Sequence, residues 1–372
     1  GRLEPVPEGF VLLQPRRMMP LLWSPVLSWR GRLRALAEPL ISAPSAVHSA
    51  DHDESVASFA RRRLGREAYE RLVEPLVGGI YVGDAEQLSL AATWPEFLEA
   101  EREHGSLYRA WRVRRAVAPP EAGARYGLFV PLQPGLSRLV EALAGSVGPA
   151  NIRTQTPIAA LARDDQRRWR LTTAAAEIDR LDGVVVAAPA AQAAALLGPL
   201  DDELGRQLAG ITAAGSVVAT LLYRREQIAR PLDGFGFVCP RIERRAILAA
   251  SFPSVKFAGR DDPAWTPVRV FLGGVHDPEA VLRSDQELQH SAASELHQLI
   301  GVRGAPEEVL VARWPAAMPQ YAVGRSRRLA AIDARAARCE GLELAGNSYG
   351  GGGLPPGVRP GRAAGERWGA VL

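Results

Sequence analysis

Two stretches of the chain carry apolar residues at helical spacing together with helix-boundary signals. Asp53 is a predicted N-cap for a helix over residues 56–64, because a short acceptor side chain there can bind an N–H of the first turn. Ser284 and Glu287 form a predicted capping box, and the apolar positions of residues 288–299 share one face. Both segments are therefore expected to be helices that pack one apolar side into a core.

Strand patterns of two kinds are present. Residues 183–190 form a continuous apolar run bounded by Gly and Pro, which predicts a strand buried on both faces. From Gly215 onward apolar and polar residues alternate instead, which favours a largely antiparallel sheet. The alternating segments are residues 217–223, 234–239, 246–251 and 268–273.

A glycine-rich segment near the C-terminus lies between a predicted strand and a predicted helix. Residues 342–344 have the pattern of a short buried strand, and residues 361–368 have the Ala, Arg and Glu content of a helix. Residues 350–353 are all glycine, so the backbone can adopt positive φ and a ligand can approach its amides closely. Such a loop points N–H groups at an anion, although an ordinary surface turn fits the spacing equally well.

A second pair of glycines follows a predicted helix over residues 67–76. Gly78 and Gly79 are expected to end that helix. Two residues without a Cβ would let a flat, bulky ligand lie against the backbone, and a plain helix-to-turn transition explains the same pair.

Composition and charge narrow the classes of function. The chain has 372 residues, 47% of them hydrophobic, and 36 glycines, so it is globular and long enough for two or three domains. Its 45 Lys and Arg slightly exceed its 41 Asp and Glu, but they are dispersed, which argues against a nucleic-acid partner. Cys239 and Cys339 stand alone, which predicts no zinc site or disulfide framework and fits a reducing compartment.

Residues with catalytic chemistry are scarce. His48 and His52 lie in a polar turn with Asp51 and Asp53, where a solvated linker is favoured over a metal site. The sequence has no Ser-His-Asp arrangement and no Gly-x-Ser-x-Gly motif. We therefore predict no catalytic side chain and no metal site.

Residues 20–30 are apolar and aromatic, with basic residues on both sides. A buried helical hairpin is favoured; the alternative is an amphipathic surface at a bilayer, with Trp23 and Trp29 at headgroup level. The sequence contains no apolar run of about 18 residues, and no signal peptide is recognisable. We therefore expect a cytoplasmic protein, with peripheral contact to the cytoplasmic membrane left open.

Several motifs point to one family. The sequence reads Ala-Gly-Asn-Ser-Tyr at 345–349, Gly-Leu-Pro at 353–355 and Gly-Arg-Ala-Ala at 361–364. Together with residues 54–84 and 101–107, these motifs closely resemble the protoporphyrinogen oxidase family of FAD-dependent enzymes. The resemblance implies an α/β (α+β mixed) chain with an FAD-linked, amine-oxidase-like fold. It covers most of the chain.

The implied fold has a flavin-domain remnant, a mixed-sheet substrate domain and a helical domain that faces a membrane in one interpretation. The expected boundaries are residues 1–11 for a strand of the substrate domain, 12–130 for the helical domain, 131–215 for a flavin-domain segment, 216–325 for the substrate domain and 326–372 for the C-terminal flavin-binding segment.

The resemblance also implies an activity in porphyrin and heme biosynthesis. Protoporphyrinogen IX would lose six electrons to FAD in successive hydride transfers, and molecular oxygen would reoxidise the flavin to give hydrogen peroxide. Coproporphyrinogen III is the alternative substrate within the family. A non-catalytic module that binds tetrapyrrole or membrane without flavin is an alternative of another class, and the resemblance leaves a homodimer open.

Site residues are transferred from the family by position. The implied flavin contacts are Ile158, Trp314, Ala345, Gly346, Asn347, Gly352, Gly353 and Leu354. The implied porphyrinogen slot consists of Gly78, Gly79, Val238, Ser251, Phe252 and Phe271. Such a slot needs a flat apolar surface and a cation for the substrate's propionates.

The chain departs from the family pattern in three respects. It contains no Gly-x-Gly-x-x-Gly that follows a strand and opens a helix, so the N-terminal pyrophosphate-binding unit is expected to be missing from this sequence. The arginine that pairs with a propionate in the family would precede residue 1. Gly324 is followed by Arg325, where the family commonly has His.

Overall fold

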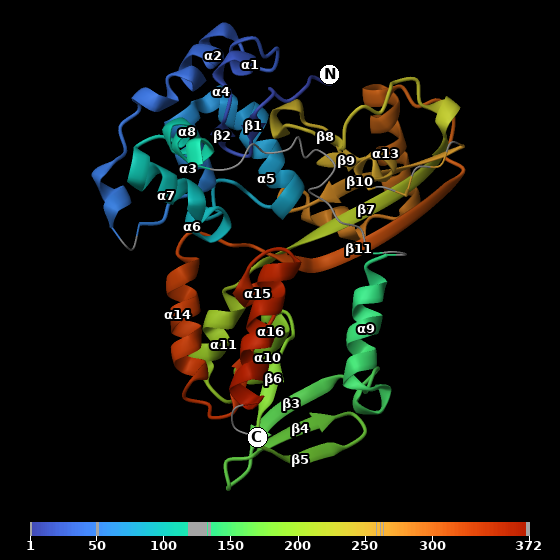
Figure 1. Ribbon diagram of the computed structural model, residues 1–372. Helices are drawn as coiled ribbons and strands as arrows, with labels where there is room; N and C mark the ends of the chain where they lie inside the picture. Colours follow the sequence, from blue (N-terminus) through green and yellow to red (C-terminus); the bar gives the residue numbers. More distant parts are fainter. Residues whose placement is uncertain are drawn as a thin grey trace. The chain divides into compact units, whose positions relative to one another are not determined.

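The computed structural model describes residues 2–49, 52–117, 132, 135–257, 259–260, 262 and 264–369. These residues form two compact units, and each unit is assembled from two separate parts of the chain. The first unit combines the described parts of 2–117 and 213–323, and the second those of 132–212 and 324–369. Figure 1 labels the elements of both units.

The N-terminal part of the first unit is a cluster of short helices. Two short strands, β1 (Phe10–Val11) and β2 (Gln14–Pro15), precede α1 (Met18–Leu22), α2 (Trp29–Leu36), α3 (Val56–Leu64), α4 (Arg66–Ala68), α5 (Glu74–Tyr81), α6 (Leu90–Thr93), α7 (Pro95–His104) and α8 (Leu107–Val117). Single 3-10 turns occupy Glu38–Leu40 and Ser45–His48, and a π-helical turn, Tyr69–Val73, joins α4 to α5.

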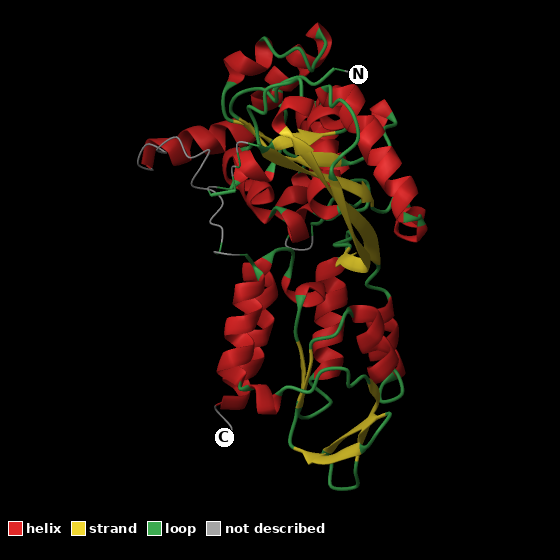
Figure 2. Cartoon of the chain, turned by 90° about the vertical axis from the view of Figure 1, so that its right-hand side faces the viewer, coloured by secondary structure: helices red, strands yellow, loops and turns green. Residues whose placement is uncertain are grey.

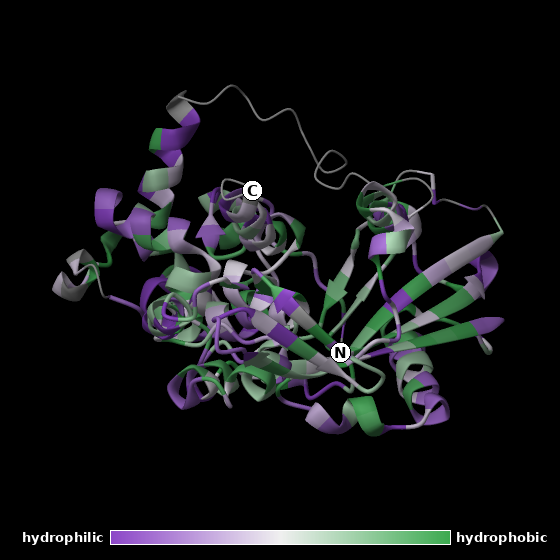
Figure 3. Ribbon diagram, turned by 90° about the horizontal axis from the view of Figure 1, so that it is seen from below, coloured by the Kyte–Doolittle hydropathy of each residue, from purple (hydrophilic) through white to green (hydrophobic). Residues whose placement is uncertain are grey.

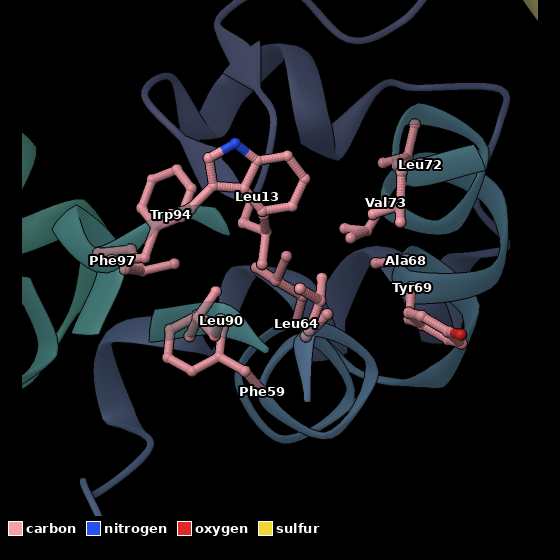
Figure 4. Packing of buried hydrophobic residues seen from close by; sticks show 14 of the residues in the cluster. Leu13, Phe59, Leu64, Ala68, Tyr69, Leu72, Val73, Leu90, Trp94 and Phe97 are labelled. Carbon is pink, nitrogen blue, oxygen red and sulfur yellow. The ribbon is translucent and has the colours of Figure 1, made fainter. Parts of the chain in front are cut away.

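The helices of this cluster share one hydrophobic core. Leu13, between β1 and β2, Phe59 and Leu64 of α3, and Leu90 of α6 contribute buried side chains to it, as Figure 4 shows. Trp94 closes one side of the same core. Burial of these large side chains removes apolar surface from water, which is the main stabilising contribution to the cluster.

The predicted helix over residues 56–64 is confirmed, but its predicted N-cap was wrong. α3 begins at Val56 and ends before Gly65, whose φ is 92°. Its N-cap is Ser55, whose Oγ accepts a bond from the Ser58 amide at 3.1 Å. Asp53 lies too far from the first turn and instead accepts a bond from Ser89 Oγ at 2.6 Å.

The helix that was expected to end at Gly78 and Gly79 continues through them. α5 runs from Glu74 to Tyr81, and its C-cap is Val82, whose φ is 46°. A glycine inside a helix costs about 1 kcal/mol relative to alanine. The close packing of α5 on Val238 and Ala249 of the neighbouring sheet, which Gly79 permits, offsets that cost.

A buried ion pair joins three elements of the helical cluster. Arg63 and Glu38 pair with no exposed side-chain surface on either residue. The Glu38 carboxylate also accepts bonds from Ser106 Oγ at 2.7 Å and from the Leu107 amide at 2.8 Å, so it caps the start of α8. Arg63 Nη2 donates to Gly105 O at 2.9 Å. Both charges are thus desolvated, paired and hydrogen-bonded, as buried charges must be.

The rest of the first unit is a five-stranded sheet in the order β11-β7-β10-β9-β8. Every pair of neighbours is antiparallel, which confirms the predicted sheet type. The strands are β7 (Ala213–Arg224), β8 (Gly236–Val238), β9 (Ala249–Ser251), β10 (Trp265–Gly273) and β11 (Glu308–Pro319). Helices α12 (Pro253–Lys256) and α13 (Asp285–Ile300) belong to the same part.

One face of this sheet packs against α13. The predicted capping box is present, because Ser284 Oγ accepts from the Glu287 amide and the Glu287 carboxylate accepts from the Ser284 amide. Leu288 and Leu296 of α13 are fully buried against Val268 and the other inward residues of β7 and β10. Burial alternates along β7 and β10, which is the period-two pattern of a sheet with one covered face. Figure 3 colours the chain by hydropathy and shows hydrophobic stretches in its strands.

The second unit contains a three-stranded antiparallel sheet and a parallel pair of strands. The antiparallel sheet is formed by β3 (Ile158–Arg163), β4 (Trp169–Thr173) and β5 (Glu177–Leu181), and the parallel pair by β6 (Val184–Val186) and β12 (Leu342–Leu344). Its helices are α9 (Ser137–Val147), α10 (Ala190–Leu197), α11 (Asp202–Ala209), α14 (Arg325–Ala336), α15 (Asn347–Gly350) and α16 (Leu354–Gly369). Helices lie on both sides of the β6–β12 pair (Figure 2).

Two expectations for this unit need correction. The apolar run at 183–190 is not buried on both faces, because Val185 of β6 is 46% exposed where no described element covers it. The helix expected at 361–368 already begins at Leu354. Prolines at 355 and 356 are compatible with that start, since a helix's first N–H groups have no partner within the helix.

The Glu38–Arg63 pair generates a stability prediction. We expect Glu38→Gln to lower the free energy of unfolding by about 3 kcal/mol, because it removes one of the two buried carboxylates that pair with Arg63, the other being Glu101 at 3.2 Å. Urea unfolding followed by circular dichroism measures the change. Glu103→Gln, at an exposed position of α7, is the matched control and should stay within about 0.5 kcal/mol of the parent chain. Equal midpoints for the two variants would show that the pair contributes nothing net.

Candidate functional site

The face of the five-stranded sheet turned away from α13 brings together residues from five strands; we call it the open face. In its central row, Val238 is paired with Ala249, Ala249 with Phe271, and Phe271 with Val218. Cross-strand partners have their Cβ atoms about 5 Å apart on one face. The row is therefore a continuous apolar strip, and it contains two of the predicted slot residues, Val238 and Phe271.

The rows on either side complete the open face. On one side Ser251 is paired with Arg269, which adds a hydroxyl and a guanidinium beside the apolar strip. On the other side Trp314 of β11 is paired with Ser216 and is 55% exposed. Trp314, predicted as a flavin contact, thus shares a sheet face with the predicted slot residues. The paired residues of these three rows include no Asp, Glu or His.

Helix α5 covers one end of the open face. A Cβ placed on Gly79 would lie 3.4 Å from Val238 Cγ1 and 3.9 Å from Ala249 Cβ, so the helix backbone rests almost directly on the central row. Gly79 and Val238, far apart in sequence, are thereby in contact. Phe252 lies elsewhere: it is 5% exposed in the core on the α13 side, with its ring centroid 6.2 Å from that of Phe237.

Gly78 borders a separate cavity of about 660 Å³ in the first unit. Glu74 of α5 lies in its wall, and burial raises the pKa of this carboxyl although the Arg241 amide donates to it at 3.1 Å. His276 lies opposite, with Nε2 3.4 Å from Arg241 Nη1; burial and the Arg241 charge lower its pKa. Burial also raises the pKa of the Cys239 thiol to about 12, so this thiol stays protonated.

The glycine segment of the second unit forms two turns around the short helix α15. Gly346 precedes α15 with φ 115° and ψ −179°, and Gly351 follows it with φ 118°. Gly353, with φ 90°, leads directly into α16. These conformations are largely restricted to glycine, so the residues at these positions are set by the backbone.

The glycines of this loop serve two different purposes. A Cβ on Gly350 would lie 2.2 Å from Pro356 O, so this glycine permits close packing of α15 on α16. A Cβ on Gly346 or Gly353 would meet nothing closer than 3.8 Å and 3.9 Å respectively. Gly346 and Gly353 therefore leave room for a ligand to approach the backbone.

The other predicted flavin residues are distributed around this loop. Ala345 is 5% exposed and its amide donates to Val186 O at 3.1 Å, so it extends the β6–β12 pairing. Asn347 is exposed at the start of α15, and Leu354 is 56% exposed at the start of α16. Ile158 begins β3 and, like Leu344 and Tyr349, packs against the hydrophobic cluster that includes Leu161 and Val186. Gly352 is exposed within the turn.

Arg325, the residue at which the chain departs from the family pattern, anchors this loop. Its Nη2 donates to Ser348 O at 3.0 Å and to Tyr349 O at 2.9 Å. The last carbonyls of a helix have no donor within the helix, and a cation there is favourable. Arg325 therefore fixes α15 and, through it, the glycine turns on either side.

The loop fits a flavin. Gly353 and Leu354 present amides at the N-terminus of α16, where the helix dipole favours electron-rich oxygens, while the prolines that follow contribute no N–H. The adjacent space is not filled by a side chain of the loop. The described residues contain no group of three or more metal-ligating side chains.

Comparison with known proteins agrees with this geometry. The family model described as flavin containing amine oxidoreductase matches residues 1–367. The chain is 31% identical to a coproporphyrinogen III oxidase of Staphylococcus aureus, covering 98% of this chain and 79% of that protein. It is 30% identical to a human protoporphyrinogen oxidase, covering 98% and 76% respectively.

A solved structure shows the same fold. An Exiguobacterium protein provisionally assigned as a protoporphyrinogen oxidase superposes with a TM-score of 0.86 at 28% identity, covering 99% of this chain and 78% of that one. The FAD-linked, amine-oxidase-like fold expected from the motifs is confirmed. The chain belongs to the flavin-containing amine oxidoreductases, a family that includes porphyrinogen oxidases, and its cofactor is accordingly FAD.

Proposed function

We propose that this chain oxidises a porphyrinogen to the corresponding porphyrin. The observation that carries the proposal is the open face: a continuous apolar strip beside one cation, with no acid–base group in its paired rows. Such a surface suits a large, flat, electron-rich macrocycle that needs binding and orientation but no strong catalytic base. FAD, when bound, supplies the acceptor for the electrons that the macrocycle loses.

The chain's own residues have binding roles in this proposal. Val238 and Phe271 offer apolar surface to the macrocycle, and Gly79 keeps side-chain atoms of α5 away from them. Ser251 offers a hydroxyl in the next row. In the second unit, Gly346, Gly353 and Leu354 offer backbone to the flavin.

Two porphyrinogens are candidates for the substrate. Relatives from Bacillus subtilis and Staphylococcus aureus are coproporphyrinogen III oxidases, and the human relative is a protoporphyrinogen oxidase. We favour coproporphyrinogen III over the first expectation of protoporphyrinogen IX, because the Staphylococcus aureus relative is slightly more identical than the human one, 31% against 30%, and is covered to 79% against 76% of its length. Molecular oxygen is the proposed final acceptor, so each macrocycle would yield three molecules of hydrogen peroxide for its six electrons.

The test is turnover by the chain loaded with FAD. Coproporphyrinogen III and protoporphyrinogen IX are supplied separately in air, and porphyrin fluorescence and hydrogen peroxide are followed together. We expect kcat/KM to be higher for coproporphyrinogen III and about three peroxides to accompany each porphyrin. No enzyme-dependent porphyrin from either substrate, with FAD demonstrably bound, would refute the proposal.

The glycine loop generates a second prediction. We expect Gly346→Ala to weaken FAD binding about tenfold or more, because φ 115° with ψ −179° strains any residue that has a Cβ. Titration of the purified chain with FAD, followed by flavin fluorescence, measures the dissociation constant. Gly357→Ala is the control, since Gly357 is helical and a Cβ there meets nothing within 4 Å. Equal affinities for the two variants would contradict the assigned loop.

We also propose that the first two helices contact a membrane surface. Leu21 and Leu27 are buried, which agrees with the expected packing, but Trp23 and Trp29 are 73% and 64% exposed. Exposed tryptophans beside arginines suit the interface of an anionic bilayer. The described helices include none long and apolar enough to cross a membrane.

Sedimentation with vesicles that contain anionic lipid tests this contact. We expect the double variant Trp23→Ala with Trp29→Ala to bind at least about fivefold more weakly than the parent chain, because it removes apolar area from the interface. Trp265→Ala, at a partly buried position of β10, serves as the control. Sedimentation of the parent chain no greater than without vesicles would exclude the contact.

A further inference from the structure

The cavity beside Gly78 is a second concave site in the first unit. Its volume of about 660 Å³ falls in the range of small-molecule pockets, about 300–1,000 Å³, and is far larger than one inorganic ion needs. Its wall comes from α3, the π-helical turn Tyr69–Val73, α5, the turn after β8 and the segment after β10. Among the described residues, this wall includes none of Val238, Ser251 and Phe271, so the cavity is distinct from the open face.

Most of the charged side chains in this wall already have partners. Four ion pairs engage them, namely Arg61 with Glu86, Arg66 with Glu70, Arg245 with Glu295 and Arg283 with Asp277. Outside these pairs the wall contains two arginines, Arg241 and Arg244, one carboxyl group, Glu74, and one imidazole, His276. The charge that the wall leaves available is therefore mainly positive.

Both available arginines belong to one tight turn. Arg241 begins the 3-10 turn Arg241–Glu243, and Arg244 follows it with φ 52°. A residue with a Cβ in this left-handed conformation costs on the order of 1 kcal/mol, and such residues cluster at ligand sites. Glu243, on the same turn, lies outside the cavity wall. Within the part of the chain that the structure describes, neither Arg241 nor Arg244 forms an ion pair with a carboxylate.

Helix α5 and the π-helical turn before it contribute another part of the wall. A Cβ on Gly78 would meet nothing within 4 Å, so the helix backbone is open at that point. The turn Tyr69–Val73 places Tyr69 in the wall, and π-helical turns recur at functional sites. Glu74 accepts a bond from the Arg241 amide at 3.1 Å, and burial raises the pKa of its carboxyl. An anion bound nearby would raise that pKa further, so protonation of Glu74 can relieve the repulsion.

We propose that this cavity binds a small organic molecule with two anionic groups, held by Arg241 and Arg244. Each planar guanidinium can donate two parallel hydrogen bonds to one carboxylate or one phosphate, and such charge-assisted bonds are the strong ones. Arg241 Nη1 also lies 3.4 Å from Nε2 of His276, whose pKa is lowered by burial and by the Arg241 charge. An anion beside the two groups would replace this unfavourable neighbour with a favourable one. The inference goes beyond the proposed function and does not depend on it.

Isothermal titration calorimetry with defined anions tests the site. The full chain is loaded with FAD, so that the flavin loop is filled, and is titrated at constant ionic strength with succinate, pyrophosphate and acetate. We expect succinate or pyrophosphate to bind with a dissociation constant below about 1 mM and at least about tenfold more tightly than acetate, because acetate can engage only one guanidinium. The tighter of the two shows whether the site prefers carboxylates or phosphates.

Variants assign that binding to the turn. Arg241→Gln and Arg244→Gln should each weaken binding of the tighter dianion about tenfold, as the loss of a charge-assisted hydrogen bond implies. Both arginines are exposed, so both variants should fold, and circular dichroism checks this. Arg244→Lys should keep part of the affinity, because a lysine carries the charge without the fork. The control is Arg230→Gln, an exposed arginine of the same unit outside the cavity wall, which should bind as the parent does.

A competition experiment separates this site from the proposed porphyrin site. Saturating coproporphyrin III should leave the dissociation constant of the dianion unchanged, whereas displacement of the dianion would make the cavity part of the porphyrin site and overturn the inference. Dianions that bind no more tightly than acetate, or that bind both glutamine variants as they bind the parent, would overturn it as well. A chain that binds the dianion but no porphyrin would contradict the proposed function and leave the anion site standing.

Discussion

The packing of α13 against one face of the antiparallel sheet is the constraint on which the candidate site depends. Because side chains alternate along each strand, committing Val268, Val270 and Leu272 to the α13 side forces Arg269 and Phe271 to the other. A shift of one residue in register would exchange the two sets. The core that stabilises the sheet therefore also determines which residues a ligand can meet.

The flavin loop depends on a different kind of constraint, the backbone itself. Gly346 and Gly353 adopt conformations with positive φ and leave space beside them, whereas Gly350 is filled by the contact of α15 with α16. Arg325 holds the carbonyl end of α15 in place. Neighbouring glycines that look alike in the sequence thus have different roles: Gly350 permits helix packing, and Gly346 and Gly353 leave space for a ligand. Arg325, from α14, fixes the position of α15 between them.

The two parts of the first unit each contain an arginine away from bulk water, but in different surroundings. Arg63 in the helical cluster has lost all contact with water, but Glu38 compensates it and ties it to the start of α8. Arg269 of β10 is half-buried, and its cross-strand partners on the open face are Ser251 and Thr220. A buried pair is tolerated because its partners complete each other's hydrogen bonds, whereas a half-buried guanidinium keeps part of its hydration.

The sequence by itself determined the family, the antiparallel sheet, the capping box at Ser284 and the presence of a glycine loop at residues 350–353. These follow from local patterns, namely alternation, helix signals and glycine, which depend on neighbours in the chain. Only the tertiary structure decided that α5 continues through Gly78 and Gly79, that Phe252 lies on the core side and that Arg269 lies beside Phe271 and Ser251. Those facts depend on strand register and helix packing between residues far apart in sequence, and no local pattern specifies them.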